Sequence, residues 1–108
     1  MENVVVFVTV SSKKEAEKIA ASLVKKGLAA CVNIIGGVES IFKWKGKIER
    51  ADELLLLAKT KKSLFKELRD EVKALHSYEV PEIIALPLIM GDKDYLKWVE
   101  DVTKKGVV

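Results

Sequence analysis

The sequence predicts one α+β domain in which strands and helices alternate along the whole chain. Three observations support this fold class. Runs of β-branched residues mark strands, apolar residues spaced three and four apart mark helices, and Gly or Pro residues separate these segments. A chain of 108 residues is also long enough to bury a core without disulfides. We therefore expect residues 1–108 to form a single domain.

The N-terminal third predicts a strand, a helix and a second strand. Residues 4–10 are a β-branched run and are predicted as a strand. Ser12 opens the pattern Ser-Lys-Lys-Glu, a capping box, so a helix is expected to begin there. Apolar residues follow at i, i+3, i+4, i+7 and i+8, and Gly27 provides the stop signal. The second strand is expected over residues 28–35.

The central third predicts a long excursion of extended chain. A bulge or bend is expected at Gly36-Gly37, after which extended chain continues over residues 38–45. The chain then turns at Gly46 and returns as a strand over residues 54–59. Trp44 lies beside this turn, and an exposed tryptophan on a protruding hairpin is commonly an interface anchor.

The C-terminal third predicts a second helix, another strand and a last short helix. The second helix is expected to begin at Thr60, because apolar residues follow at helical spacing. The strand is expected over residues 83–90, with an edge or a bulge at Pro87, which cannot donate to a sheet. Gly91-Asp92 is expected to cap the last helix. The order strand, helix, strand, strand, helix, strand, followed by an extra C-terminal helix, is the ferredoxin-like βαββαβ pattern.

The predicted strands are apolar on both faces. In the first strand, Val4, Val6, Val8 and Val10 share one face, while Val5 and Phe7 lie on the other. Helices that pack on one face of a sheet cannot cover the second face as well. We therefore expect an obligate oligomer that is built through the open sheet faces.

Composition restricts the classes of partner and compartment. The 19 basic and 16 acidic residues are interspersed, which argues against a nucleic-acid-binding surface. Apolar runs are too short to span a bilayer, and no signal segment precedes the first strand, so a membrane location is not expected. A single cysteine favours a reducing compartment, and we expect the cytoplasm. The 32% charged content also favours thermostability.

Candidate metal ligands gather in residues 76–82. His76, Glu79 and Glu82 carry imidazole and carboxylate groups, and Cys31 carries the only thiol. Each has a plainer interpretation: His76 lies where it could cap the second helix, and a free cysteine is commonly a small buried hydrophobe. A catalytic Cys-His pair is a further alternative, but no orienting partner or glycine-rich turn accompanies it. No phosphate-binding loop or dinucleotide fingerprint is present.

With these motifs in hand, the chain resembles the CutA family of divalent-cation tolerance proteins. The matching stretches run in the family's order over nearly the whole chain: residues 29–33, 40–49, 53, 59–60, 76–82 and 91–98. The chain departs from the family at Ser77, where a proline is usual. The resemblance implies a non-enzymatic homotrimer with an architecture like that of PII signalling proteins, cytoplasmic residence, and a link to metal tolerance, copper above all. It also implies that Cys31 and His76 are metal-binding positions.

The leading hypothesis is a trimeric metal-responsive binding protein. Cys31 and His76 would be ligands, and Glu79, Glu82, Glu53 or a neighbouring subunit would complete the coordination sphere. No obligatory cofactor is expected, and the ligand would be copper or another divalent metal. Two alternatives remain: a PII-like module that binds a small anionic ligand, and a trimeric scaffold that anchors a protein partner yet to be identified.

Overall fold

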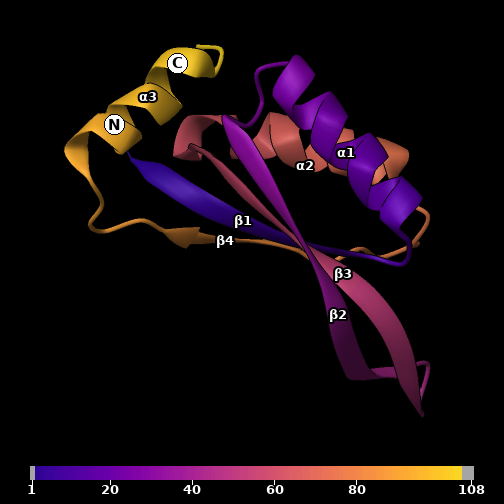
Figure 1. The fold of residues 1–108 in the computed structure, drawn as a ribbon. Helices are drawn as coiled ribbons and strands as arrows, with labels where there is room; N and C mark the ends of the chain where they lie inside the picture. Colours follow the sequence, from indigo (N-terminus) through magenta and orange to yellow (C-terminus); the bar gives the residue numbers. More distant parts are fainter. Residues whose placement is uncertain (1, 106–108) are drawn as a thin grey trace.

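The computed structural model describes residues 2–105 and confirms the ferredoxin-like order of elements with an additional C-terminal helix (Figure 1). The elements are β1 (Asn3–Val10), α1 (Lys13–Lys25), β2 (Cys31–Trp44), β3 (Lys47–Lys61), a 3-10 turn (Lys62–Leu64), α2 (Phe65–Leu75), β4 (Ile83–Pro87) and α3 (Lys93–Val102). No helix within residues 2–105 is long and apolar enough to cross a membrane.

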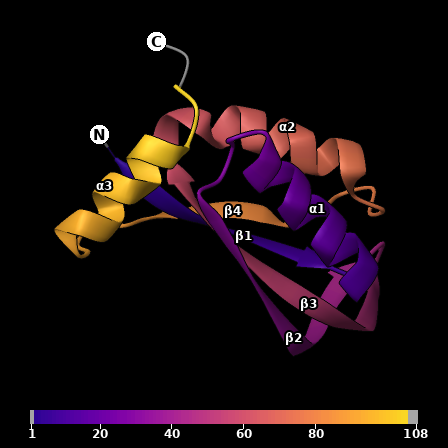
Figure 2. The same cartoon turned by 45° about the horizontal axis from the view of Figure 1, so that its top comes forward.

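The four strands form one antiparallel sheet in the order β2-β3-β1-β4. Helices α1 and α2 cover one face of this sheet, and the opposite face is bare (Figures 1 and 2). Helix α3 lies at the end of the sheet where β1 begins. The Asn3 side-chain amide donates there to the Leu96 carbonyl of α3, and the Lys61 ammonium lies 3.5 Å from the Thr103 carbonyl.

The core lies between the sheet and helices α1 and α2. The side chains that fill it come from the even-numbered positions of β1 and β3 and from the apolar stripes of the two helices. Its fully buried members are Val6, Val8, Val10, Ala16, Ile19, Leu23, Leu56, Ala58, Leu68 and Val72. The expected helical stripe and the expected strand alternation therefore meet in one hydrophobic cluster.

The second strand begins at Cys31 and not at the predicted residue 28. Helix α1 ends in a tight turn in which Gly27 adopts a positive φ of 70° and the Leu28 amide donates to the Leu23 carbonyl. Leu28 is therefore buried beneath the helix as part of the turn. The expected irregularity at Gly36-Gly37 is present as a shift of register between Ile35 and Val38, and the strand continues on both sides of it.

Two further predicted boundaries are wrong. Strand β3 continues through Lys61, so Thr60 lies in the sheet instead of beginning helix α2. The buried Thr60 hydroxyl donates to the Leu28 carbonyl at 2.7 Å, which holds the residue in the strand. Strand β4 ends at Pro87 and not at Met90. The Leu88 amide still donates to the Asn3 carbonyl, but its partner strand β1 begins at Asn3.

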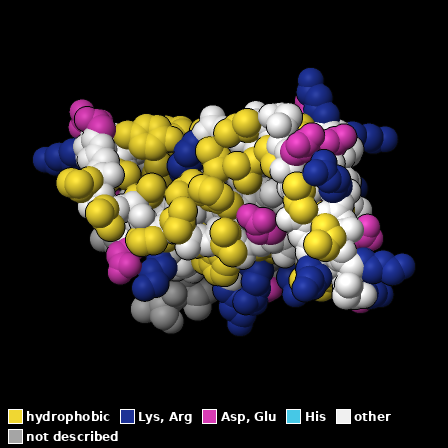
Figure 3. All heavy atoms as spheres, turned by 90° about the horizontal axis from the view of Figure 1, so that it is seen from below, with side chains coloured by type: hydrophobic (Ala, Val, Ile, Leu, Met, Phe, Trp, Pro, Cys, Tyr) yellow, Lys and Arg dark blue, Asp and Glu magenta, His cyan; other side chains and the backbone are white. Residues whose placement is uncertain are grey.

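The distal halves of β2 and β3 form a hairpin that projects beyond the other strands (Figure 1). The pairing runs to Trp44 and Lys47, and Lys45 and Gly46 form the turn with φ values of 50° and 81°. Hydrophobic side chains also gather over the bare face of the sheet, with Lys and Arg side chains at its border (Figure 3). The predicted two-faced sheet is therefore present in the single chain.

Candidate functional site

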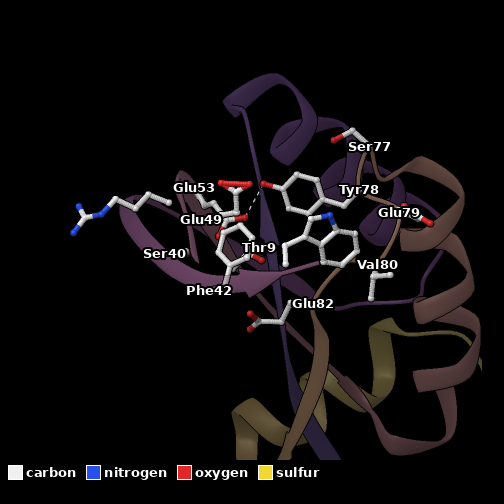
Figure 4. Close-up of a pocket in the computed structure, with 12 residues that line it drawn as sticks. Thr9, Ser40, Phe42, Glu49, Glu53, Ser77, Tyr78, Glu79, Val80 and Glu82 are labelled. Atoms are coloured by element: carbon white, nitrogen blue, oxygen red, sulfur yellow. Dashed lines mark hydrogen bonds between the residues drawn. The ribbon is translucent and has the colours of Figure 1, made fainter. Parts of the chain in front are cut away.

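The segment between α2 and β4 passes the end of β1 and approaches the projecting hairpin. A cleft of about 640 Å³ lies between them (Figure 4). Its lining combines aromatic side chains with carboxylates: Thr9, Ser40, Phe42, Trp44, Glu49, Arg50, Glu53, Ser77, Tyr78, Glu79, Val80 and Glu82. Three of the five predicted site residues, Glu53, Glu79 and Glu82, therefore line one cleft.

His76 links the α2–β4 segment to the end of β1 through hydrogen bonds. Its side chain has no exposed area, and its Nε2 lies 2.7 Å from the Thr9 carbonyl oxygen. The Tyr78 amide lies 3.0 Å from Nδ1 and can only donate, so Nδ1 accepts and Nε2 carries the hydrogen that is donated to Thr9. Both ring nitrogens of neutral His76 are thus engaged within the chain.

Tyr78 connects His76 to strand β3 of the hairpin. Its ring packs against the His76 ring with the centroids 4.7 Å apart, and its hydroxyl donates to Glu53 Oε2 at 2.7 Å. Desolvation, together with the hydrogen bond to the Glu53 carboxylate, raises the pKa of Tyr78 to about 12. The phenol therefore stays protonated and orients Glu53 throughout the neutral range.

Glu53 is a buried carboxylate that forms no ion pair in the described part of the chain. Only 7% of the residue is exposed, and none of the ion pairs within residues 2–105 includes it. Arg50 lines the same cleft but forms no ion pair with Glu53 in this part of the chain. Because a buried charge is costly unless it is paired, this carboxylate favours the binding of a cation.

The carboxylates of the cleft do not form a single cluster. Glu53 lies beside the Tyr78 hydroxyl, whereas Glu82 lies separately beyond Thr9 and Phe42 (Figure 4). Glu49 is four residues from Glu53 on β3, which corresponds to about 13 Å at the rise of a strand. Glu79 extends away from these carboxylates. The cleft therefore has two acidic ends, one at Glu53 and one at Glu82.

Cys31 lies far from His76 along the sheet. It is half-buried on the bare face, where it pairs with Lys59, which is opposite Val5 of β1. His76 contacts Thr9, four residues further along β1, which corresponds to about 13 Å at the rise of a strand. The structure does not bring these two predicted ligands together in one protomer. No group of three His, Cys, Asp or Glu side chains within residues 2–105 has a geometry that could hold a metal ion.

Sequence reasoning missed the contribution of the hairpin to this cleft. Glu49, Phe42 and Ser40 were not considered as site residues, and Trp44 was considered only as an interface anchor. The signal was present in the turn at Gly46, because the turn sets the register that pairs Phe42 with Glu49. Strand alternation then places Ser40, Phe42 and Trp44 on one side of the hairpin, facing the α2–β4 segment.

The fold and this cleft define a ferredoxin-like α+β protein with an acidic, aromatic-lined cleft between a projecting hairpin and the α2–β4 segment. The chain belongs to the CutA1 divalent ion tolerance protein family, whose family model matches residues 4–102. Membership in this family assigns a tolerance protein and not an enzyme.

Individual relatives agree with this assignment over most of the chain. A divalent-cation tolerance protein CutA from Thermus thermophilus is 50% identical over 92% of this chain and 96% of its own. The solved structure of the Thermus thermophilus divalent cation tolerance protein covers 94% of this chain and 99% of its own, with 48% identity and a TM-score of 0.93. The structure of CutA1 from Oryza sativa covers 98% and 97%, with 43% identity and a TM-score of 0.95.

Some relatives are considerably longer than this chain. The Arabidopsis thaliana protein named "Protein CutA, chloroplastic" is 45% identical over 94% of this chain, which spans only 56% of that relative. A structure from Archaeoglobus fulgidus, 45% identical with a TM-score of 0.92 over 94% of this chain and 99% of its own, is described as periplasmic. Relatives of this fold are thus named for more than one compartment.

Proposed function

We propose that this protein is a homotrimeric divalent-cation tolerance protein that binds its cation at the carboxylates of the cleft. The observation that supports this most directly is Glu53, a buried carboxylate that is oriented by Tyr78 and lacks a cationic partner within residues 2–105. Glu82 and Glu79 supply two further carboxylates on the same cleft. Carboxylate oxygens are ligands for hard divalent cations such as Mn²⁺ and Mg²⁺.

Copper is the metal that the family resemblance implies, and it prefers sulfur and nitrogen ligands. Cys31 is half-buried on the bare face of the sheet, which is the face expected to meet another subunit. We therefore propose that Cys31 contributes to a copper site that two subunits share. His76 would act indirectly, by holding Tyr78, because both of its ring nitrogens are engaged.

Calorimetric titration of Cu²⁺ and Mn²⁺ into the intact protein tests both parts of this proposal. We expect Glu53→Gln to weaken Mn²⁺ binding by more than about tenfold, and Cys31→Ser to weaken Cu²⁺ binding alone. Glu17→Gln, which changes an exposed carboxylate of α1 outside the cleft, is the matched control. Equal metal affinity in wild type and Glu53→Gln would exclude the cleft as the metal site.

The trimer is proposed from the bare face of the sheet. Ile35, Ile84 and Leu86 are 44%, 50% and 48% exposed there, and Val5 and Phe7 lie between them on the central strand. On the hairpin, Ile41 and Ile48 are 59% and 73% exposed on the side that faces away from the cleft. Apolar area of this extent is normally covered by another protein surface. Size exclusion with light scattering should give the mass of three chains, and a stable monomer would contradict the proposal.

The charge of the cleft disfavours one alternative hypothesis. A PII-like module would bind a small anionic ligand, but Glu49, Glu53, Glu79 and Glu82 oppose an anion and only Arg50 would attract it. A scaffold role, with a protein partner yet to be identified, is not favoured by any contact in residues 2–105. The single unpaired cysteine remains the reason for proposing a reducing compartment such as the cytoplasm.

A further inference from the structure

We propose that the cleft also binds an organic dication, a molecule of the diamine class with an ammonium group at each end of an apolar stem. This inference shares the cleft with the proposed function, but it does not depend on metal binding. It is carried by three features that a metal site does not require: two separate acidic ends, an aromatic lining and the volume of the cleft.

The two acidic ends match a ligand with two positive charges held apart. Glu53 forms one end at the Tyr78 hydroxyl, and Glu82 forms the other beyond Thr9 (Figure 4). A small ion can contact only one of these ends at a time. An ammonium group beside Glu53 would supply the positive partner that this buried carboxylate lacks within residues 2–105.

The aromatic lining suits an organic cation better than a hydrated metal ion. Phe42, Trp44 and Tyr78 line the cleft, and aromatic faces attract ammonium groups through their quadrupoles. Trp44 already receives such a contact, since the Lys45 ammonium lies 5.7 Å from the centre of its ring. The apolar stem of a diamine would pack on Phe42 and Val80, as the stems of Lys side chains pack on apolar surface.

The volume of the cleft fits a small organic molecule. About 640 Å³ lies within the usual range of ligand-binding clefts, and it exceeds what a single metal ion with its ligands would fill. The lining side chains are partly fixed before binding, because His76 holds the Tyr78 amide and Tyr78 holds Glu53. A fixed lining reduces the entropy that is lost when the ligand binds.

Titration of cadaverine, a five-carbon diamine, into intact metal-free protein in the presence of a chelator tests the proposal. Calorimetry measures the affinity, and the Trp98→Phe variant reports the location, because it leaves Trp44 as the only indole. We expect saturable binding with a change in Trp44 fluorescence. Pentylamine, with one ammonium group, should bind about tenfold more weakly, which corresponds to about 1.4 kcal/mol. Uncharged pentanediol should not bind.

Matched variants test whether cadaverine binds in this cleft or elsewhere on the acidic surface. Glu53→Gln and Glu82→Gln should each weaken cadaverine binding about tenfold, whereas Glu17→Gln on α1 should leave it unchanged. Circular dichroism confirms that each variant is folded. Absence of saturable binding, equal affinity for pentylamine, or equal affinity in Glu53→Gln and Glu17→Gln would each overturn the inference. Binding of cadaverine without any copper or manganese affinity would refute the proposed function and leave the inference standing.

Discussion

His76 is the residue on which the geometry of the cleft depends. Its fully buried ring connects the end of α2 to β1 through Thr9 and to the α2–β4 segment through Tyr78. The Glu15 carboxylate also lies 3.3 Å from Nδ1, and it approaches from α1. The His76 side chain thus joins the end of α2, a strand and the segment that lines the cleft, while the Glu15 carboxylate of α1 accepts from the Ser77 amide.

Replacement of His76 by Ala should destabilise the protein substantially. The substitution removes a buried ring and leaves the Thr9 carbonyl and the Tyr78 amide without partners, so we expect a loss of about 3 kcal/mol in the free energy of unfolding. Chemical denaturation measures this loss, with Glu17→Gln as the control. A change below about 1 kcal/mol would show that the ring contributes little to the position of the segment.

Titration of Tyr78 should report the negative charge of Glu53. In Tyr95→Phe, Tyr78 is the only tyrosine, and ultraviolet absorbance should show its phenol ionising at a pKa of about 12. Glu53→Gln should move this pKa toward the ordinary value of 10.0, because the neutral amide no longer opposes the phenolate. An unchanged pKa in Glu53→Gln would mean that burial and the Glu15 carboxylate cause the shift without Glu53.

The same shift predicts how stability depends on alkaline pH. The pKa of Tyr78 is raised in the folded state, so the stability that its protonated form provides is fully present below pH 10. That stability is lost as the pH rises from 10 to about 12, where the folded protein binds one more proton than the unfolded chain. Tyr78→Phe should lose this part of the alkaline dependence in denaturation experiments.

At the level of elements, the end of β3 depends on a contact that joins residues far apart in the sequence. Thr60 stays in the strand because its hydroxyl donates to the Leu28 carbonyl in the turn after α1. We expect Thr60→Val, which keeps the shape but removes the donor, to cost about 1–3 kcal/mol by leaving a buried carbonyl unpaired. Thr60→Ser keeps the donor and should cost less in the same denaturation assay. Equal losses in both variants would assign the effect to packing of the methyl group.

The predicted elements are correct where local sequence patterns determine the structure. They are wrong where contacts between distant residues determine it. The strand over residues 4–10 and the helix after Ser12 follow from alternation, helical spacing and a cap, in which Ser12 accepts from the Glu15 amide as expected. The start of α2 could not be predicted, since Thr60 reads locally as a cap, whereas its pairing with Val4 of β1 and its bond to the distant Leu28 carbonyl hold it in the sheet. The predictions of the site residues divide in the same way, into those that follow from local sequence and those that depend on distant contacts. The cluster at residues 76–82 contains much of it, whereas the contribution of Phe42 and Glu49 requires the register of the hairpin.

For the whole molecule, exposed ion pairs give little support to the expected thermostability. The Lys and Arg pairs within residues 2–105 are isolated pairs at the surface, such as Lys97–Asp101 at 2.9 Å and Lys62–Glu2 at 3.5 Å. Isolated exposed pairs contribute little to stability, in contrast to networks. Burial of the bare sheet face in the proposed trimer is the larger available source of stability, because that face exposes several large apolar side chains. Stability gained from association depends on protein concentration.

A charge on the bare face should therefore lower the melting temperature by separating the subunits. Ile84 is half-exposed in the middle of that face, and Ile84→Lys would place an ammonium group inside the proposed interface. We expect this variant to elute as a monomer and to melt at a lower temperature that no longer rises with protein concentration. Val24→Lys is the matched control, because Val24 is 46% exposed near the C-terminus of α1, where a cation is favourable. If both variants remain trimeric and melt alike, the bare face is not the surface that joins the subunits.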